Sequence, residues 1–325
     1  MSGSRAAIVA AALAVGLLGA RGTIGHAHAR GTAEETAQAE LIGEGVISTP
    51  DDEFGGSISP DGTAMYFDKT VPPHYLYTLC VSHLLKGAWT TPEVMPFSGQ
   101  YRDSDPVLSP DGNTLLFASD RPLAGSRGKS FYIWASTKTK NGWSEPKALE
   151  GPVNSEGSQV FASLASNGNL YFTSDRKGQF DIYRSRLVNG KYAEAEDLGP
   201  KINDPTISSL EAFVAPDESY LLIGSFGRQP GFGNSDIFIS YNENGTWSVP
   251  KNLGPAINTL AREYSPRVTP DGKWLIFTSE RGMQSEKRDK SFTYAEFTEK
   301  ARGIFDGLGN IYRIGMDYVL RTTRP

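Results

Sequence analysis

Ser109-Pro-Asp-Gly112, followed by Asn113-Thr-Leu-Leu-Phe-Ala-Ser-Asp-Arg121, is the stretch that decides the fold. Proline fixes φ and glycine accepts a positive φ, so the first four residues suit a tight turn. The apolar run that follows suits a short buried strand. Versions of the turn phrase recur with an Asp or Asn at positions 61, 111, 167, 217 and 271, at spacings of 50, 56, 50 and 54 residues. The chain therefore contains about five copies of one unit.

Each copy continues with further strand and turn signals. A variable loop leads to a third strand such as Asp181-Ile-Tyr183, and an Asn-Gly turn with an aromatic residue follows, as in Asn141-Gly-Trp143. Asn-Gly between strands is a strong hairpin signal. Four short antiparallel strands in about 50 residues, repeated along a chain, are typical of a β-propeller. We expect an all-β propeller of about five four-stranded blades, with six blades as the alternative.

The last copy lacks an outer strand, and the N-terminal region supplies a match for it. Ile42-Gly-Glu-Gly-Val46 resembles Leu253-Gly-Pro-Ala-Ile257 and leads into the first turn phrase in the same way. The sequence thus predicts that the N-terminal strand closes the ring by completing the last blade. The propeller domain is expected to span residues 40–325.

The N-terminus has the features of an export signal. A short basic start, fifteen small or apolar residues from Ala6 to Ala20, and Ala27-His28-Ala29 predict a signal peptide over residues 1–29, cleaved after Ala29. The apolar run is shorter than the roughly 20 residues that span a bilayer, so a membrane anchor is the less favoured alternative. Residues 30–39 are expected to be a disordered lead-in. The predicted location is periplasmic or secreted, with no transmembrane segment after signal removal.

The amino-acid composition limits which ligands and metal sites the chain can be expected to have. With 32 basic and 37 acidic residues the chain is mildly acidic, which gives no electrostatic case for binding nucleic acid. Cys80 is the single cysteine, and His74 and His83 are the histidines that follow the expected signal. We therefore expect no metal site and no cofactor.

Taken together, the Ser-Pro-Asp-Gly turns, Leu115-Leu-Phe-Ala-Ser-Asp-Arg121, Asp181-Ile-Tyr183 and Asn244-Gly-Thr-Trp247 resemble the WD40-like propeller repeats of the TolB type. The resemblance covers nearly the whole chain after the expected signal. It implies an exported bacterial propeller that serves protein–protein contact. TolB propellers have six blades, whereas five copies are counted here.

One polar phrase recurs with the blades. An arginine follows the second strand in four of the five copies, in the phrases Ser119-Asp-Arg121, Ser174-Asp-Arg176, Ser279-Glu-Arg281 and the looser Ser225-Phe-Gly-Arg228. These arginines either face an anionic ligand or form a network that joins neighbouring blades, and recurrence favours the network. The same two interpretations apply to the acidic residues before the turns, namely Glu53, Asp103 and Glu263, with Glu211 near that position.

Loops that differ between copies are better candidates for a binding site, because variable loops on a rigid ring commonly carry function. They lie on the face opposite the Pro-Asp-Gly turns. The longest, residues 282–309, contains a capping box at Thr293-Tyr-Ala-Glu296 and predicts a short amphipathic helix, either a lid or a helix packed on the rim. The candidate binding residues on this loop face are Glu53, His74, Asp103, Arg121, Arg127, Arg176, Glu211, Arg228, Glu263 and Arg281. No catalytic residue stands out.

Two functions remain open. The favoured one is a non-catalytic module that binds another protein or a cell-envelope polymer. The alternative is a glycoside hydrolase or polysaccharide lyase with carboxylates at the channel mouth, such as Glu53 or Glu263. Carboxylates converging in a deep pocket would favour the enzyme, and a channel plugged by side chains would favour binding.

Overall fold

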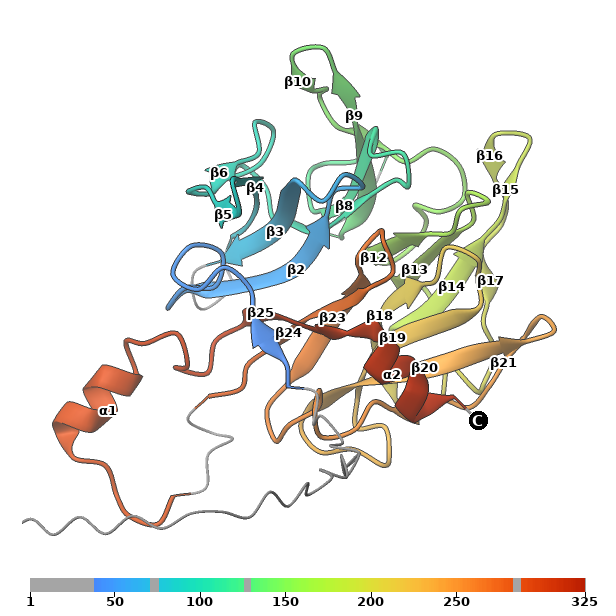
Figure 1. Cartoon of the computed structure of the whole chain (residues 1–325). Coiled ribbons are helices and arrows are strands. Elements are labelled where there is room, and N and C mark those ends of the chain that lie inside the picture. Colours follow the sequence, from blue (N-terminus) through green and yellow to red (C-terminus); the bar gives the residue numbers. More distant parts are fainter. Residues whose placement is uncertain (1–37, 71–75, 126–129, 283–287, 325) are drawn as a thin grey trace, which may run out of the picture. The chain divides into compact units, whose positions relative to one another are not determined.

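Five antiparallel sheets follow one another along the chain in the computed structural model (Figure 1). The structure describes residues 38–70, 76–125, 130–282 and 288–324, all within the unit Thr36–Pro325. The expected signal peptide, most of the lead-in, His74 and Arg127 lie outside these ranges.

The first two sheets repeat one pattern, in which three longer strands are followed by two short outer ones. Blade 1 contains β2 (Asp52–Ile58), β3 (Ala64–Thr70), β4 (Tyr77–Leu85), β5 (Ala88–Trp89) and β6 (Glu93–Val94). Blade 2 contains β7 (Asp103–Leu108), β8 (Thr114–Ser119), β9 (Tyr132–Thr139), β10 (Gly142–Trp143) and β11 (Lys147–Ala148).

Blades 3 and 4 keep the order of the three inner strands. Blade 3 contains β12 (Gln159–Leu164), β13 (Leu170–Ser174), β14 (Asp181–Ser185) and β17 (Glu196–Asp197), with the small hairpin β15 (Leu187–Val188) and β16 (Lys191–Tyr192). Blade 4 contains β18 (Ser208–Val214), β19 (Tyr220–Phe226), β20 (Ser235–Glu243), β21 (Thr246–Trp247) and β22 (Lys251–Asn252).

Blade 5 is completed from the other end of the domain, as the sequence predicts. It contains β23 (Glu263–Val268), β24 (Trp274–Ser279) and β25 (Asn310–Gly315), and its outer strand is β1 (Glu40–Leu41). Leu41 lies opposite Tyr312 in the antiparallel pair of β1 and β25. The count of five blades and the closure of the ring are both confirmed.

The recurrent Pro-Asp-Gly turn is stabilised by hydrogen bonds among its own residues. In blade 1, Ser59 Oγ donates to Asp61 Oδ1 at 2.6 Å, and the Thr63 amide donates to the same oxygen at 3.0 Å. Gly62 supplies the positive φ of 72° that the turn needs. In blade 4, Glu218 stands at the glycine position and adopts a φ of 57°. Each turn joins the innermost strand of a blade to the next strand.

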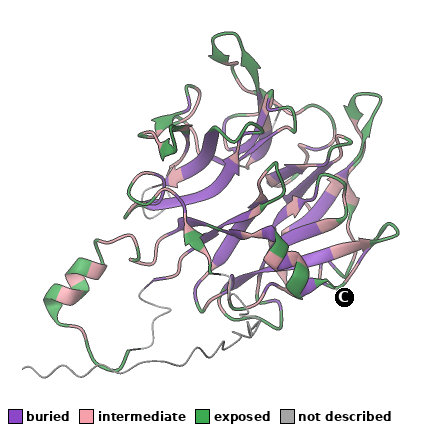
Figure 2. Ribbon diagram, in the orientation of Figure 1, coloured by how far each residue is buried: buried purple, intermediate pink, exposed green. Residues whose placement is uncertain are grey.

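The core lies between blades rather than inside any one of them, and the long strands are buried along most of their length (Figure 2). The cluster of Ile47, Met65, Phe67 and Ile276 joins blade 5 to blade 1. The hairpin aromatics take part: Trp143 of blade 2 meets Tyr66 of blade 1 edge-on, at 5.9 Å between ring centroids. Stability therefore depends on every neighbouring pair of blades.

Two helices follow the last turn phrase in the described part of the chain. Helix α1 (Tyr294–Lys300) begins with the predicted capping box, in which Thr293 and Glu296 bond reciprocally, but none of its residues is buried. Helix α2 (Met316–Thr323) is not predicted by the sequence analysis. It directly follows β25 and buries Met316 and Val319 in the cluster between blades 4 and 5.

Candidate functional site

The five innermost strands form the wall of the ring. β2 contacts β7, β7 contacts β12, β12 contacts β18, β18 contacts β23, and β23 returns to β2. Each of these strands carries a β-bulge where its register shifts. At the bulge Asp105, Phe161 and Ser265 adopt positive φ values of 59°, 53° and 48°. A bulge redirects side chains next to the extra residue, and here those residues border the axis.

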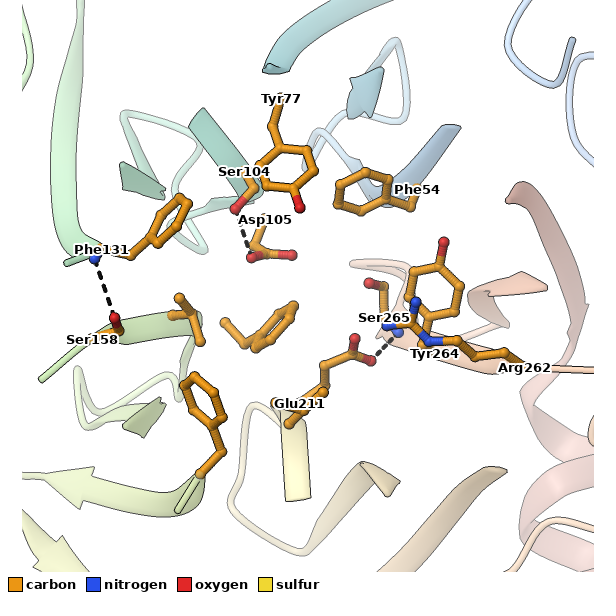
Figure 3. Close-up of a pocket in the computed structure, with 14 residues that line it drawn as sticks. Phe54, Tyr77, Ser104, Asp105, Phe131, Ser158, Glu211, Arg262, Tyr264 and Ser265 are labelled. Carbon is orange, nitrogen blue, oxygen red and sulfur yellow. Dashed lines mark hydrogen bonds between the residues drawn. The ribbon is translucent and has the colours of Figure 1, made fainter. Parts of the chain in front are cut away.

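A cavity of about 280 Å³ lies on the face opposite the Pro-Asp-Gly turns (Figure 3). It is formed by the first halves of the inner strands and by residues just before or at the start of the third strands. Six aromatic residues contribute to its lining, namely Phe54, Tyr77, Phe131, Phe161, Phe180 and Tyr264. The polar lining residues include Asp105, Glu211, Arg262 and Ser265, and the carboxylates of Asp105 and Glu211 point toward the middle of the cavity.

Three of these polar residues, Asp105, Glu211 and Ser265, come from different blades and are deeply buried. Asp105 is 2 % exposed, and Glu211 and Ser265 are each 1 % exposed. The Ser265 amide donates to Glu211 Oε2, which links blade 5 to blade 4. The other carboxylate oxygens, Asp105 Oδ1 and Glu211 Oε1, and the hydroxyl of Ser265 have no hydrogen-bond partner among the described residues.

Burial changes the acidity of both carboxyl groups. Burial, reinforced by the nearby Glu211 carboxylate, raises the pKa of Asp105 to about 7. Burial likewise raises the pKa of Glu211 to about 6, against the opposing attraction of Arg262. Behind Asp105, Asp68 accepts the Asp105 amide at 2.9 Å, and burial raises the pKa of Asp68 well above its usual range. The cavity thus holds two acids that change charge near neutral pH.

Arg267 closes the axis behind the cavity. It is 3 % exposed, and its guanidinium donates to Ala162 O of blade 3 at 3.5 Å. Arg267 also lines a second hollow, of about 260 Å³, beside the Pro-Asp-Gly turns, and it interacts with Asp105 and Glu211 on the other side. The channel is therefore plugged, and carboxylates also converge above the plug.

The arginines of the repeated Ser-Asp-Arg phrase bind the connections between blades. Arg121, Arg176, Arg228 and Arg281 donate respectively to the backbone oxygens of Phe97, Val153, Ile202 and Ile257, at 2.6–3.1 Å. Each of these oxygens belongs to the segment that leads from the preceding blade. Each arginine also bonds a serine hydroxyl of its own phrase. These contacts match the framework network that recurrence favours.

The acidic candidates divide into two groups. Glu53 and Glu263 both accept hydrogen bonds from a threonine four residues earlier, Thr49 and Thr259. Asp103 pairs with Arg121 at 2.8 Å. None of these three lines the cavity, whereas Glu211 does. Among the candidate residues that the structure describes, Glu211 is thus the one placed in the cavity.

Several cavity residues are absent from the sequence-based set of candidates. Asp105 has a sequence signal, because it stands among the carboxylates before the second turn phrase. Ser265 and Arg262 have none, and neither has Arg267 behind the cavity, since their role depends on the bulges and on cross-axis contacts. No described residue of the 282–309 loop lines the cavity.

Two structural absences hold for the described residues. They contain no group of three or more His, Cys, Asp or Glu side chains that could hold a metal ion. Within the same ranges, no helix has the length and apolar character needed to cross a membrane.

The fold and the cavity together define a five-bladed β-propeller with an acidic, aromatic-walled cavity on its axis. No family profile and no curated protein matches the chain. Among solved structures, it is similar to TolB from Acinetobacter baumannii, with 18 % identity, a TM-score of 0.47, and coverage of 81 % of this chain and 54 % of that one. The chain thus spans about half the length of that TolB structure.

Enzyme structures show a similar degree of likeness. A gluconolactonase from Xanthomonas campestris has 9 % identity and a TM-score of 0.46, covering 86 % of this chain and 89 % of that one. Hydrazine synthase of Kuenenia stuttgartiensis has 11 % identity and a TM-score of 0.48, covering 82 % and 41 %. These similarities carry no argument about function, which has to come from the cavity itself.

Proposed function

We propose that this chain is an exported, non-catalytic binding propeller that recognises another protein or a cell-envelope polymer by taking one projecting group of that partner into the axial cavity. The observation that carries the proposal is the set of unpartnered buried atoms on Asp105, Glu211 and Ser265 in a cavity lined by aromatic rings. Buried polar atoms without partners cost about 1–3 kcal/mol each, so a bound group that pairs with them gains stability. The plug at Arg267 gives the cavity a floor.

The volume of the cavity favours binding of a single group of the partner rather than an extended chain. Pockets for drug-sized ligands measure roughly 300–1,000 Å³, and this cavity of about 280 Å³ lies at the lower limit. It suits one side chain or one terminal group of a larger partner.

The test compares capture by variants that differ at the cavity alone. Ser158 lines the cavity and is half-buried, so Ser158→Phe should fill part of it. Thr246→Phe adds the same ring at an exposed position on β21 and serves as the matched control. Immobilised wild type and Thr246→Phe should retain the same component of a cell-envelope extract, and Ser158→Phe should lose it. Equal capture by all three proteins, at equal thermal stability, would refute the role of the cavity.

One specific observation supports the alternative function as an enzyme. Two carboxyl groups whose pKa values are raised to about 7 and about 6 have the acidity that general acid–base chemistry uses. In that interpretation Asp105 and Glu211, rather than Glu53 or Glu263, would act on a glycosidic bond. Turnover in an oligosaccharide panel that disappears in both Asp105→Asn and Glu211→Gln would establish the enzyme and overturn the binding proposal.

A further inference from the structure

The charges around the cavity do not balance. Near its floor the guanidinium groups are Arg262 and Arg267, and Arg262 is paired with Glu280 at 3.4 Å. Arg262 and Arg267 both attract Asp105 and Glu211, so these two guanidinium groups are shared among the three carboxyl groups of Asp105, Glu211 and Glu280. Once Asp105 and Glu211 are both ionised, the site carries one negative charge more than its cations compensate. A buried charge is either paired or neutralised by a proton, so one further cation would complete the site with both carboxyls ionised.

The unpartnered oxygen atoms in the cavity determine which kind of cation can bind there. Asp105 Oδ1 and Glu211 Oε1 are hydrogen-bond acceptors, so the cation should carry N–H donors. A quaternary ammonium has no such donor. A metal ion is disfavoured because the described residues form no cluster of three or more suitable ligands.

The aromatic lining of the cavity also suits a cation that carries N–H donors. Aromatic faces attract cations through the ring quadrupole, and the attraction strengthens when the cation is desolvated. The cavity already holds Arg262 over the ring of Tyr264, 4.0 Å from its centroid. An ammonium group carried on a small apolar body could meet the carboxylates with its nitrogen and the aromatic walls with its carbon atoms.

We propose that the axial cavity binds a primary ammonium group carried on a compact apolar body, with Asp105 and Glu211 as its acceptors. This inference rests on the proposed binding function and names the chemistry of the group that enters. The same ammonium chemistry occurs in free organic amines and in the lysine side chains of a partner protein.

Three probes of one shape test the charge and the donors separately. Benzylamine carries an ammonium group, benzyl alcohol is its neutral counterpart, and benzyltrimethylammonium keeps the charge without N–H donors. Calorimetric titration of the full folded chain should give one benzylamine site. Its affinity should exceed that for either other probe by about tenfold or more, as expected when a desolvated charge pair and its hydrogen bonds are lost. Equal affinity for benzyl alcohol would refute the charge argument, and equal affinity for benzyltrimethylammonium would refute the donor argument.

Variants locate the site. Asp105→Asn keeps the shape of the side chain, and asparagine tolerates the positive φ at this position. Asp105→Asn and Glu211→Gln should each weaken benzylamine binding by about tenfold or more. Asp271→Asn changes an aspartate in an exposed turn and should leave binding unchanged. Undiminished binding in both cavity variants would overturn the assignment.

The wild type offers a test that needs no variant. Benzylamine stays protonated below pH 8, while Asp105 and Glu211 gain protons as the pH falls through about 7 and about 6. Benzylamine affinity should therefore fall by about tenfold or more between about pH 8 and about pH 5. Besides each other, the ionisable groups that face these two acids are Asp68, Tyr77, Arg262, Tyr264 and Arg267. A pH-independent affinity would contradict the role of the two acids.

Two further outcomes separate this inference from the function it rests on. If Ser158→Phe abolishes partner capture but no amine binds, the ammonium assignment is wrong and the binding proposal stands. If benzylamine binds at Asp105 but capture is insensitive to Ser158→Phe, the cavity is an amine site and the proposed partner recognition fails. If N-acetyllysine methylamide binds as tightly as benzylamine, the natural ligand is a lysine side chain. If benzylamine binds more tightly, the natural ligand is a free amine.

Discussion

Closure of the ring can be tested at Ile47, which lies between β1 and blade 1. Its side chain is fully buried in the cluster that contains Met65 and Phe67 of blade 1 and Ile276 and Ile311 of blade 5. Replacing it with alanine removes buried methyl and methylene groups and leaves a cavity where the two blades meet. Substitutions of this kind cost about 2–5 kcal/mol.

The expected shift in melting temperature follows from the size of the domain. For domains of about 150–250 residues each kcal/mol lowers Tm by roughly 2–4 °C, and this domain is somewhat larger. Ile47→Ala should therefore lower Tm by about 4–15 °C, measured by circular dichroism during heating and checked by urea unfolding. The control is Val249→Ala, because Val249 is 70 % exposed.

Deletion of residues 40–48 extends the same test. It also removes Ile42 from the cluster, the hydrogen bond from the Ile42 amide to Ile311 O at 2.9 Å, and the pairing of β1 with β25. The free edge of β25 would then be exposed, which favours aggregation. The loss should exceed that of Ile47→Ala. An unchanged Tm in both proteins would refute closure by the N-terminal strand.

Two other predictions concern the polar residues of the ring. Arg176→Ala should destabilise the fold by about 1–3 kcal/mol in urea unfolding, since it leaves Val153 O and Ser174 Oγ without their guanidinium donor. If the variant instead keeps wild-type stability but loses partner capture, Arg176 is a ligand contact. Asp105 binds more protons in the folded than in the unfolded state between about pH 4 and about pH 7, because its folded pKa is raised, so the stability of the unliganded wild type should fall as the pH rises through that window. Asp105→Asn should remove this part of the slope and be the more stable protein above about pH 7, and identical pH profiles for the two proteins would contradict the raised pKa.

Much of the fold was predictable because its signals are local. A turn phrase such as Ser109-Pro-Asp-Gly112 specifies backbone angles within four residues, and the apolar run after it specifies a buried strand. Recurrence then indicated the propeller, and the similarity of Ile42-Gly-Glu-Gly-Val46 to a blade ending indicated the closure. Helix α2 was missed, because Met316 and Val319 become apolar anchors through contact with two blades.

The sequence by itself determined the repeat, the closing strand and the capped helix at Thr293, and it favoured five blades over six, since each depends on residues close together in the chain or on a pattern that recurs. Only the tertiary structure decided which polar groups form a site. Asp105 and Glu211 are two of many carboxylates that precede the turn phrases, Ser265 has no sequence signal, and the three residues lie in separate repeats. The ring places them around one axis, where burial removes water from their carboxyl and hydroxyl groups. Their acidity and their unpaired atoms are therefore properties of the closed ring, which no single blade possesses.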